Sequence, residues 1–256
     1  MAMVALGLLI ALPGCSKPMA PGLRVGMELA YPPFEMTNTA GQPAGVSVEI
    51  AKALAKHLGL QLDIQNLPFD GLIPALRTGK IDLILSSMTE TTERAEAIDF
   101  SAPYLRTGLC LLISKESPIQ SAADLDVPGR VIAVKLGTTG HTYALENFKS
   151  AKVIVLEKED ACVLEVVQRK ADAFIYDQMS VYKNWDRNRD TTRPLLNPFR
   201  EESWAIGIRK GNDTLREHVN AFLAEFRASG GFERLGDQFL KEQKDAFQKL
   251  GHSFYF

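Results

Sequence analysis

Short apolar segments alternate with segments of helical period along most of the chain, and this order constrains the fold more than any other feature. In the first half, strands are predicted at 23–27, 60–65 and 81–85, and helices at 48–59 and 72–78. Strands that alternate with helices pair in parallel and place the helices on the faces of the sheet. The first half therefore predicts an α/β unit.

The second half repeats this order. Strands are predicted at 130–134, 152–157, 171–176 and 204–210, and helices at 139–148, 160–170 and 213–231. At roughly 100–200 residues per domain, a chain of 256 residues suggests two domains. We therefore expect two α/β units.

Charge and residue spacing exclude several classes of function. The net charge is −2 and the lysines and arginines are scattered, so no nucleic-acid-binding surface is predicted. The histidines are isolated and the cysteines show no CxxC spacing, so we expect no metal and no cofactor. Cys110 and Cys162 are predicted to be separate buried thiols, with a disulfide as the alternative.

The N-terminal segment is apolar up to Cys15. It is shorter than the about 20 residues that a membrane span needs, and it fits the hydrophobic region of a secretory signal. Residues 12–15 (LPGC) resemble a lipobox, although no basic residue precedes the apolar run and Pro13 is unusual there; a disordered leader is the alternative. We expect residues 1–22 to be a lipoprotein signal and tether, with lipid on Cys15 anchoring the protein at the periplasmic or extracellular face of the membrane.

A hydroxyl-rich run follows the predicted strand at 81–85. It contains Ser86, Ser87, Thr89, Thr91 and Thr92, and Arg94 comes directly after them. Hydroxyl and backbone N–H donors beside a planar guanidinium fit a carboxylate, so the run predicts a socket for a small organic acid. The alternative is an exposed helical ion pair, because Glu90 and Arg94 are four residues apart.

The stretch GKIDLILSSMTETTERAEAIDFSAPY at 79–104 resembles the signature of the bacterial extracellular solute-binding proteins, family 3. These are type II periplasmic binding proteins that capture polar amino acids for import. Further matching segments follow the family's order: YPPFEM at 31–36, GQPAGVSVEIAKALAKHLG at 41–59, FDGLIPALRTGKIDL at 69–83, GTTG at 137–140 and ADAFIYD at 171–177.

The resemblance implies a two-lobed type II periplasmic-binding-protein fold, in which helices flank a mixed, mostly parallel sheet in each lobe. Lobe 1 is expected at 23–106 plus 201–256 and lobe 2 at 107–200. Two extended crossings, near 105–109 and 196–203, would form a two-strand hinge that lets the lobes close around a ligand.

The resemblance also assigns the two charged ends of an amino acid. Its carboxylate would be bound by Arg94, Ser87 and Thr89 from lobe 1, and by Thr139 from lobe 2, where the GTTG loop opens a helix. Asp177 would bind the ammonium group. An aspartate between a strand and a helix is also a common N-cap, and that role is the alternative.

For the ligand side chain, the matching positions are Glu28, Tyr31 and Phe69. The alternatives are a solvated strand-end charge for Glu28 and core packing for the two rings. If Lys135 reaches Glu28 across the cleft, the two charges cancel and a neutral amide such as glutamine fits best. If Lys135 points away, lysine, arginine, ornithine or histidine fits. Two departures from the family pattern are Ser47, which replaces an acid, and Glu28, which replaces an aspartate.

The sequence therefore predicts an extracytoplasmic, monomeric binding protein that captures a polar or basic L-amino acid and delivers it to the permease of an ABC importer. One rival is a cyclohexadienyl dehydratase acting on prephenate or arogenate, which needs a general acid such as Glu28. Against an enzyme, the sequence shows no Ser–His–Asp order and no metal ligand set. The other rival is a sensory ligand-binding subunit.

Overall fold

The structure is a computed structural model that describes residues 22–252. Cys15 and the predicted signal and tether up to residue 21 lie outside the described residues, so lipid attachment stays a prediction. Within residues 22–252, no helix is both long enough and apolar enough to span a bilayer.

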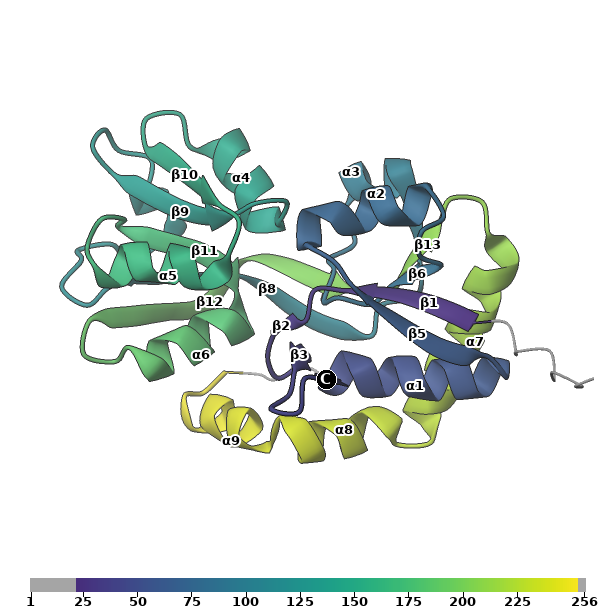
Figure 1. Cartoon of the computed structure of the whole chain (residues 1–256). Coiled ribbons are helices and arrows are strands. Elements are labelled where there is room, and N and C mark those ends of the chain that lie inside the picture. The colour runs from purple at the N-terminus through teal and green to yellow at the C-terminus, as the bar shows by residue number, and fades with distance from the viewer. Residues whose placement is uncertain (1–21, 253–256) are drawn as a thin grey trace, which may run out of the picture.

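The first lobe is built on a five-stranded sheet of order β5-β1-β6-β13-β7. Its strands are β1 (Gly22–Met27), β5 (Gln61–Asn66), β6 (Leu83–Ile84), β7 (Ile98–Phe100) and β13 (Gly207–Arg209). The helices of this lobe are α1 (Val46–Leu58), α2 (Leu72–Arg77), α3 (Thr92–Ala97), α7 (Asp213–Ala228), α8 (Gly231–Phe239) and α9 (Lys241–Lys249). A small sheet of β2 (Ala30–Tyr31), β3 (Glu35–Thr37) and β4 (Pro43–Ala44) lies beside α1 (Figure 1).

The second lobe is built on a sheet of order β10-β9-β11-β8-β12. Its strands are β8 (Leu105–Ser114), β9 (Val131–Lys135), β10 (Lys152–Leu156), β11 (Ala173–Asp177) and β12 (Thr192–Trp204). Its helices are α4 (Thr139–Asn147), α5 (Glu159–Val167) and α6 (Gln178–Arg187). Figure 1 shows the two lobes side by side, so the predicted two-lobed α/β architecture is confirmed.

The sheets are mixed, as predicted, but they are not mostly parallel. In each of the two five-stranded sheets of the described chain, two strand pairings are parallel and two are antiparallel. The antiparallel pairings are those of β8 with β11 and β12, and those of β13 with β6 and β7. β8 leads the chain from the first lobe into the second and β12 leads it back, so these two strands run in opposite directions and pair antiparallel.

β8 and β12 are the two passages between the lobes (Figure 1). They pair antiparallel from Trp204 opposite Leu105 to Arg200 opposite Leu109, and the register shifts between Leu195 and Arg200. The predicted crossings at 105–109 and 196–203 therefore lie side by side as one two-stranded ribbon. The predicted lobe boundaries, and bending of this ribbon as a hinge, stay predictions.

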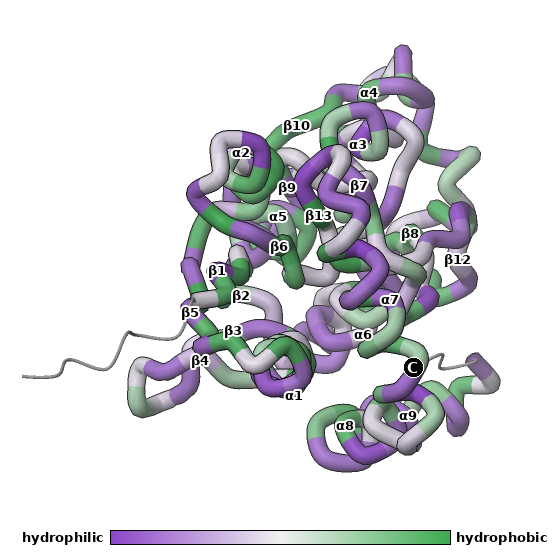
Figure 2. Tube along the Cα trace, turned by 90° about the vertical axis from the view of Figure 1, so that its right-hand side faces the viewer, coloured by the Kyte–Doolittle hydropathy of each residue, from purple (hydrophilic) through white to green (hydrophobic). Residues whose placement is uncertain are grey.

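Local sequence explains where the helices end. In α1, Ile50 and Leu54 are four residues apart and fully buried, and Gly59 ends the helix in the left-handed conformation with φ of 67°. The helix predicted at 213–231 stops at Ala228 because Gly230 also adopts φ of 72°, after which α8 begins. In Figure 2, hydrophobic colour follows inner strands such as β6, whose side chains are buried.

The two described cysteines are free and buried, so the alternative of a disulfide between them is wrong. Both lie in an apolar cluster on one face of the second sheet. Burial raises the pKa of Cys110 and raises that of Cys162 to about 12. Both thiols are therefore protonated and unreactive at neutral pH.

Candidate ligand-binding site

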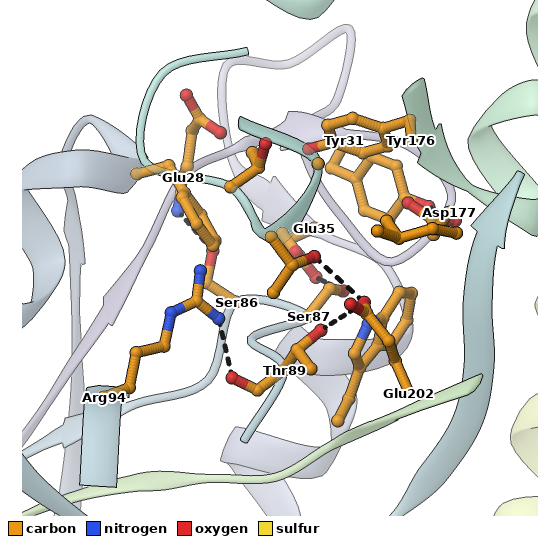
Figure 3. Close-up of a pocket in the computed structure, with 16 residues that line it drawn as sticks. Glu28, Tyr31, Glu35, Ser86, Ser87, Thr89, Arg94, Tyr176, Asp177 and Glu202 are labelled. Carbon is orange, nitrogen blue, oxygen red and sulfur yellow. Dashed lines mark hydrogen bonds between the residues drawn. The ribbon is translucent and has the colours of Figure 1, made fainter. Parts of the chain in front are cut away.

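A cavity of about 460 Å³, counted with its open mouth, lies between the two lobes (Figure 3). Of the nine residues predicted to bind the ligand, eight line the cavity: Glu28, Tyr31, Phe69, Ser87, Thr89, Arg94, Thr139 and Asp177. Lys135 contacts Glu28 at the edge of the same cavity.

Arg94 points into the cavity from the first turn of α3 (Figure 3). Thr91 caps this helix by accepting a hydrogen bond from the Arg94 N–H at 3.1 Å. The guanidinium donates to the carbonyl of Thr89 at 2.6 Å and, across the cleft, to the carbonyl of Gly137 at 2.9 Å. Neither the predicted alternative pair with Glu90 nor any other ion pair of Arg94 occurs among residues 22–252. Burial lowers the pKa of Arg94, as expected for a cation without a carboxylate partner.

The GTTG loop brings the second lobe against the first. Gly137 has φ of 75°, and a Cβ there would lie 3.0 Å from the Cβ of Asp70 in the other lobe. Thr138 is the N-cap of α4 and accepts from the N–H of His141 at 3.3 Å. A Cβ at Gly140 would lie 2.8 Å from the carbonyl of Ile175, so the helix start packs directly on β11. The two glycines therefore allow the approach that puts Thr139 in the cavity.

Asp177 lies at the end of β11 and is buried. Its Oδ1 accepts from the N–H groups of Met179 and Ser180 at 3.0 and 3.1 Å and from the hydroxyl of Tyr31 at 2.6 Å. The aspartate is therefore the N-cap of α6 and also lines the cavity. Its Oδ2 accepts no hydrogen bond from the described part of the chain. Burial raises the pKa of Asp177 to about 6, so the carboxylate is mostly ionised at pH 7.

The two predicted stacking aromatics differ in their surroundings. Tyr31 is 5% exposed, stacks on Phe34 at 5.6 Å between ring centroids and meets Trp204 edge-on at 6.0 Å. Its ring is therefore core, and its hydroxyl holds Asp177. Phe69 is half-buried and lies beneath two cations: its ring centroid is 5.6 Å from the guanidinium carbon of Arg94 and 5.5 Å from the Lys135 Nζ.

Glu28 and Lys135 form an ion pair across the cleft. Glu28 follows β1 and Lys135 ends β9, and the ammonium of Lys135 donates directly to the Glu28 carboxylate. The side chains are 18% and 5% exposed, respectively. Of the two alternatives that the sequence left open, the structure has the one in which Lys135 reaches Glu28.

Two buried acids in the cavity were not predicted. Glu35 accepts from the hydroxyls of Ser47 at 2.6 Å and Ser87 at 3.1 Å, and burial raises its pKa to about 8. The Ser87 hydroxyl, predicted for the ligand carboxylate, is thus directed at Glu35. Glu202 on β12 accepts from Thr89 and Thr139. An acid at position 47 would face Glu35, which gives a physical reason for the serine there.

The remaining cavity walls come from residues that are not among the nine predicted to bind the ligand. They are Ser86, Leu109, Thr138, Gly140, Tyr176 and Trp204. The Ser86 hydroxyl accepts from the Glu28 N–H at 2.9 Å and so fixes the chain where β1 ends. Ser87, which follows, has φ of 47°, an uncommon left-handed conformation for a serine.

Comparison with known proteins identifies the chain. The model of the bacterial extracellular solute-binding proteins, family 3, matches residues 23–242. The chain belongs to this family. This solute-binding protein is 29% identical to the L-cystine-binding protein TcyJ of Escherichia coli, over 84% of the chain and 81% of the relative. It is 31% identical to the L-arginine-binding protein of Pseudomonas aeruginosa, over 85% of the chain and 87% of the relative.

Solved structures are similar over comparable lengths. An ancestral arginine-binding protein bound to arginine superposes with a TM-score of 0.81 at 31% identity, covering 87% of this chain and 99% of the other. An ancestral amino-acid-binding protein, described as a precursor of cyclohexadienyl dehydratase, gives 0.78 at 35% identity, covering 85% and 95%. The predicted family and the type II binding-protein fold of this solute-binding protein are therefore confirmed.

Proposed function

We propose that this solute-binding protein captures a free α-amino acid between its lobes and delivers it to the permease of an ABC importer. One observation carries the proposal. Arg94 of lobe 1 is a largely buried cation with no ion-pair partner in the described chain, and Asp177 of lobe 2 has one unused oxygen in the same cavity. A zwitterion supplies a carboxylate for the first and an ammonium for the second. The names of the relatives, which bind cystine and arginine, support the same class of ligand.

Within the polar and basic amino acids, the ion pair favours a neutral side chain. Lys135 and Glu28 compensate each other at the edge of the cavity. A cationic side chain placed there would be repelled by the ammonium of Lys135, and an anionic one by Glu28. An amide offers an N–H donor to the carboxylate and an oxygen acceptor to the ammonium. Glutamine is therefore the first ligand to test.

The experiment is a thermal-shift screen of the twenty amino acids. A ligand at 100 times its dissociation constant adds about 2.7 kcal/mol to the stability of the folded state. Arg94→Ala and Asp177→Asn should each abolish the shift, and asparagine keeps an N-cap acceptor for α6. Arg77→Ala and Asp190→Asn remove exposed side chains of the same types and should leave the shift unchanged. A shift that survives in both cavity variants would refute the assignment of the site.

A dehydratase is the second candidate, and one observation favours it. Glu35 has a pKa of about 8 and holds its proton near neutral pH, which a general acid requires. Glu28, the acid predicted for that reaction, is instead paired with Lys135. Release of phenylpyruvate from prephenate tests this candidate. We expect no release beyond that of a Glu35→Gln variant.

The remaining parts of the proposal concern where the protein works. We propose that it acts on the periplasmic or extracellular side, in agreement with its family, as a monomer tethered through lipid on Cys15. A sensory subunit would use the same cavity. Uptake of the labelled ligand, lost when the gene is deleted and restored by the wild-type protein, separates import from sensing.

A further inference from the structure

Glu202 lies in β12, in the ribbon that passes between the lobes, and its side chain is 3% exposed. One oxygen, Oε2, accepts hydrogen bonds from the hydroxyl of Thr89 and from the hydroxyl of Thr139, each at 3.0 Å (Figure 3). Thr89 belongs to lobe 1 and Thr139 opens α4 of lobe 2. A single carboxylate oxygen therefore joins donors from both lobes.

The other oxygen of Glu202 lacks a hydrogen-bond donor among the described residues. Oε1 is buried and accepts no hydrogen bond from residues 22–252. Arg200, on the same strand, is its nearest cation, with Nε at 3.9 Å, beyond hydrogen-bond distance. A buried acceptor without a donor costs free energy. Burial accordingly raises the pKa of Glu202, even though both threonines and the nearby Arg94 favour its charged form.

The carboxylate of Glu202 lies among residues that are predicted to bind the carboxylate of the ligand. Thr89 and Thr139 are two of these residues, and the charge of Arg94, a third, also acts on Glu202. A hydroxyl has one proton to donate. While Thr89 and Thr139 donate to Glu202, their oxygens present lone pairs to the cavity, which disfavour a second carboxylate. Two carboxylates in one socket also repel each other.

We propose that Glu202 is a built-in substitute for the carboxylate of the ligand. Its Oε2 holds Thr89 and Thr139 together and so keeps the lobes close, and an incoming amino acid must displace it from both hydroxyls. Glu202 is therefore an affinity-determining residue that works against the ligand. This inference rests on the proposed function for the ligand, but the effect of Glu202 on closure can be tested without any ligand.

The first measurement is calorimetric titration of L-glutamine, and of L-arginine, into the wild type and Glu202→Gln. The amide keeps the size of the side chain but loses the charge, so it competes less well for the hydroxyls. We expect the dissociation constant to fall about tenfold, the equivalent of one charge-assisted hydrogen bond. Glu201→Gln is the matched control, because Glu201 is an exposed acid on the neighbouring position of the same strand and should leave the affinity unchanged.

The second measurement is the radius of gyration by small-angle X-ray scattering without ligand. Glu202→Ala removes the acceptor and should give a more open protein than the wild type or Glu201→Gln. If the alanine variant does not fold, Glu202→Gln is measured instead and should shift in the same direction.

The outcomes separate the two proposals. An affinity of Glu202→Gln that is lower than that of the wild type, or within twofold of it, overturns the competition. Equal radii of gyration for all variants overturn the role in closure. If no amino acid binds the wild type, the proposed function fails, and the scattering data still decide whether Glu202 holds the lobes together.

Discussion

Glu35 provides the sharpest quantitative prediction. Its carboxyl is 1% exposed, and its contacts among the described residues include two serine hydroxyls but no cation within ion-pair distance. Removal from water dominates and raises its pKa from 4.5 to about 8, although the two hydrogen bonds and the charge of Lys135 act in the opposite direction. At pH 7 the folded protein therefore holds a proton on Glu35 that the unfolded chain has released.

The sign and size of the effect follow from this difference. Between pH 4.5 and about 8 the native state binds more protons than the unfolded state, so stability falls as the pH rises through this window. Each pH unit corresponds to about 1.36 kcal/mol. At pH 7, which is 2.5 units above 4.5, the ionisable side chain lowers the free energy of unfolding by about 3 kcal/mol relative to a neutral side chain. Above pH 8 the cost levels off near 5 kcal/mol.

Glu35→Gln should remove this cost, because glutamine is neutral and its carbonyl still accepts from Ser47. We expect the free energy of unfolding at pH 7 to rise by about 3 kcal/mol and the gain at pH 5 to be below about 1 kcal/mol. Urea denaturation at pH 5, 7 and 9 measures both values. Glu96→Gln, at an exposed position, is the control and should show no such trend.

Two results would contradict the reasoning. The first is a stability difference between Glu35→Gln and the wild type that is the same at pH 5 and pH 9. The second is a Glu35→Gln variant that is less stable than the wild type at pH 9. Either would mean that Glu35 is ionised in the folded protein.

Three further predictions concern the ligand and the anchor. Because the pKa of Asp177 is raised to about 6, the dissociation constant of the amino acid should rise about tenfold for each pH unit below 6. Titration calorimetry measures this rise. The Asp177→Asn variant should bind the amino acid weakly and should lack this pH dependence. Lys135→Met should free Glu28 and let arginine or lysine bind in the thermal-shift screen, whereas Lys152→Met, at an exposed position, should not. Cys15→Ser should move the protein from the membrane fraction to the soluble fraction, and an unchanged distribution would exclude a lipid on Cys15.

Much of the fold and part of the site could be predicted from short stretches of sequence. The hydroxyl-rich run with Arg94, the GTTG loop and the aspartate that ends β11 are local signals, and the structure brings all three to one cavity. Such signals can be found because strand and helix periods, caps and turns depend on residues only a few positions apart. Asp177 is an example, since its position between β11 and α6 makes it both the N-cap of the helix and a residue of the cavity wall.

Glu35 and Glu202 are buried acids that such local signals do not reveal. Glu201 and Glu202 are adjacent acids, and successive residues of a strand point to opposite sides, so only the register of β12 decides which one is buried. Glu35 lies within the recognised YPPFEM segment, but its burial depends on Ser47 in α1 and Ser87 after β6. No local pattern marks either acid as a buried carboxyl.

By itself, the sequence determined the two α/β units, because these depend on periodicity. Its motifs also resembled those of one family, and that resemblance implied which groups at the strand ends form the site. The tertiary structure decided which charges meet. Glu28 and Lys135 are 107 positions apart, and Thr89 and Glu202 are 113 apart. Their pairing depends on how closely the two lobes approach, and that approach is set by packing across the ribbon and the cleft.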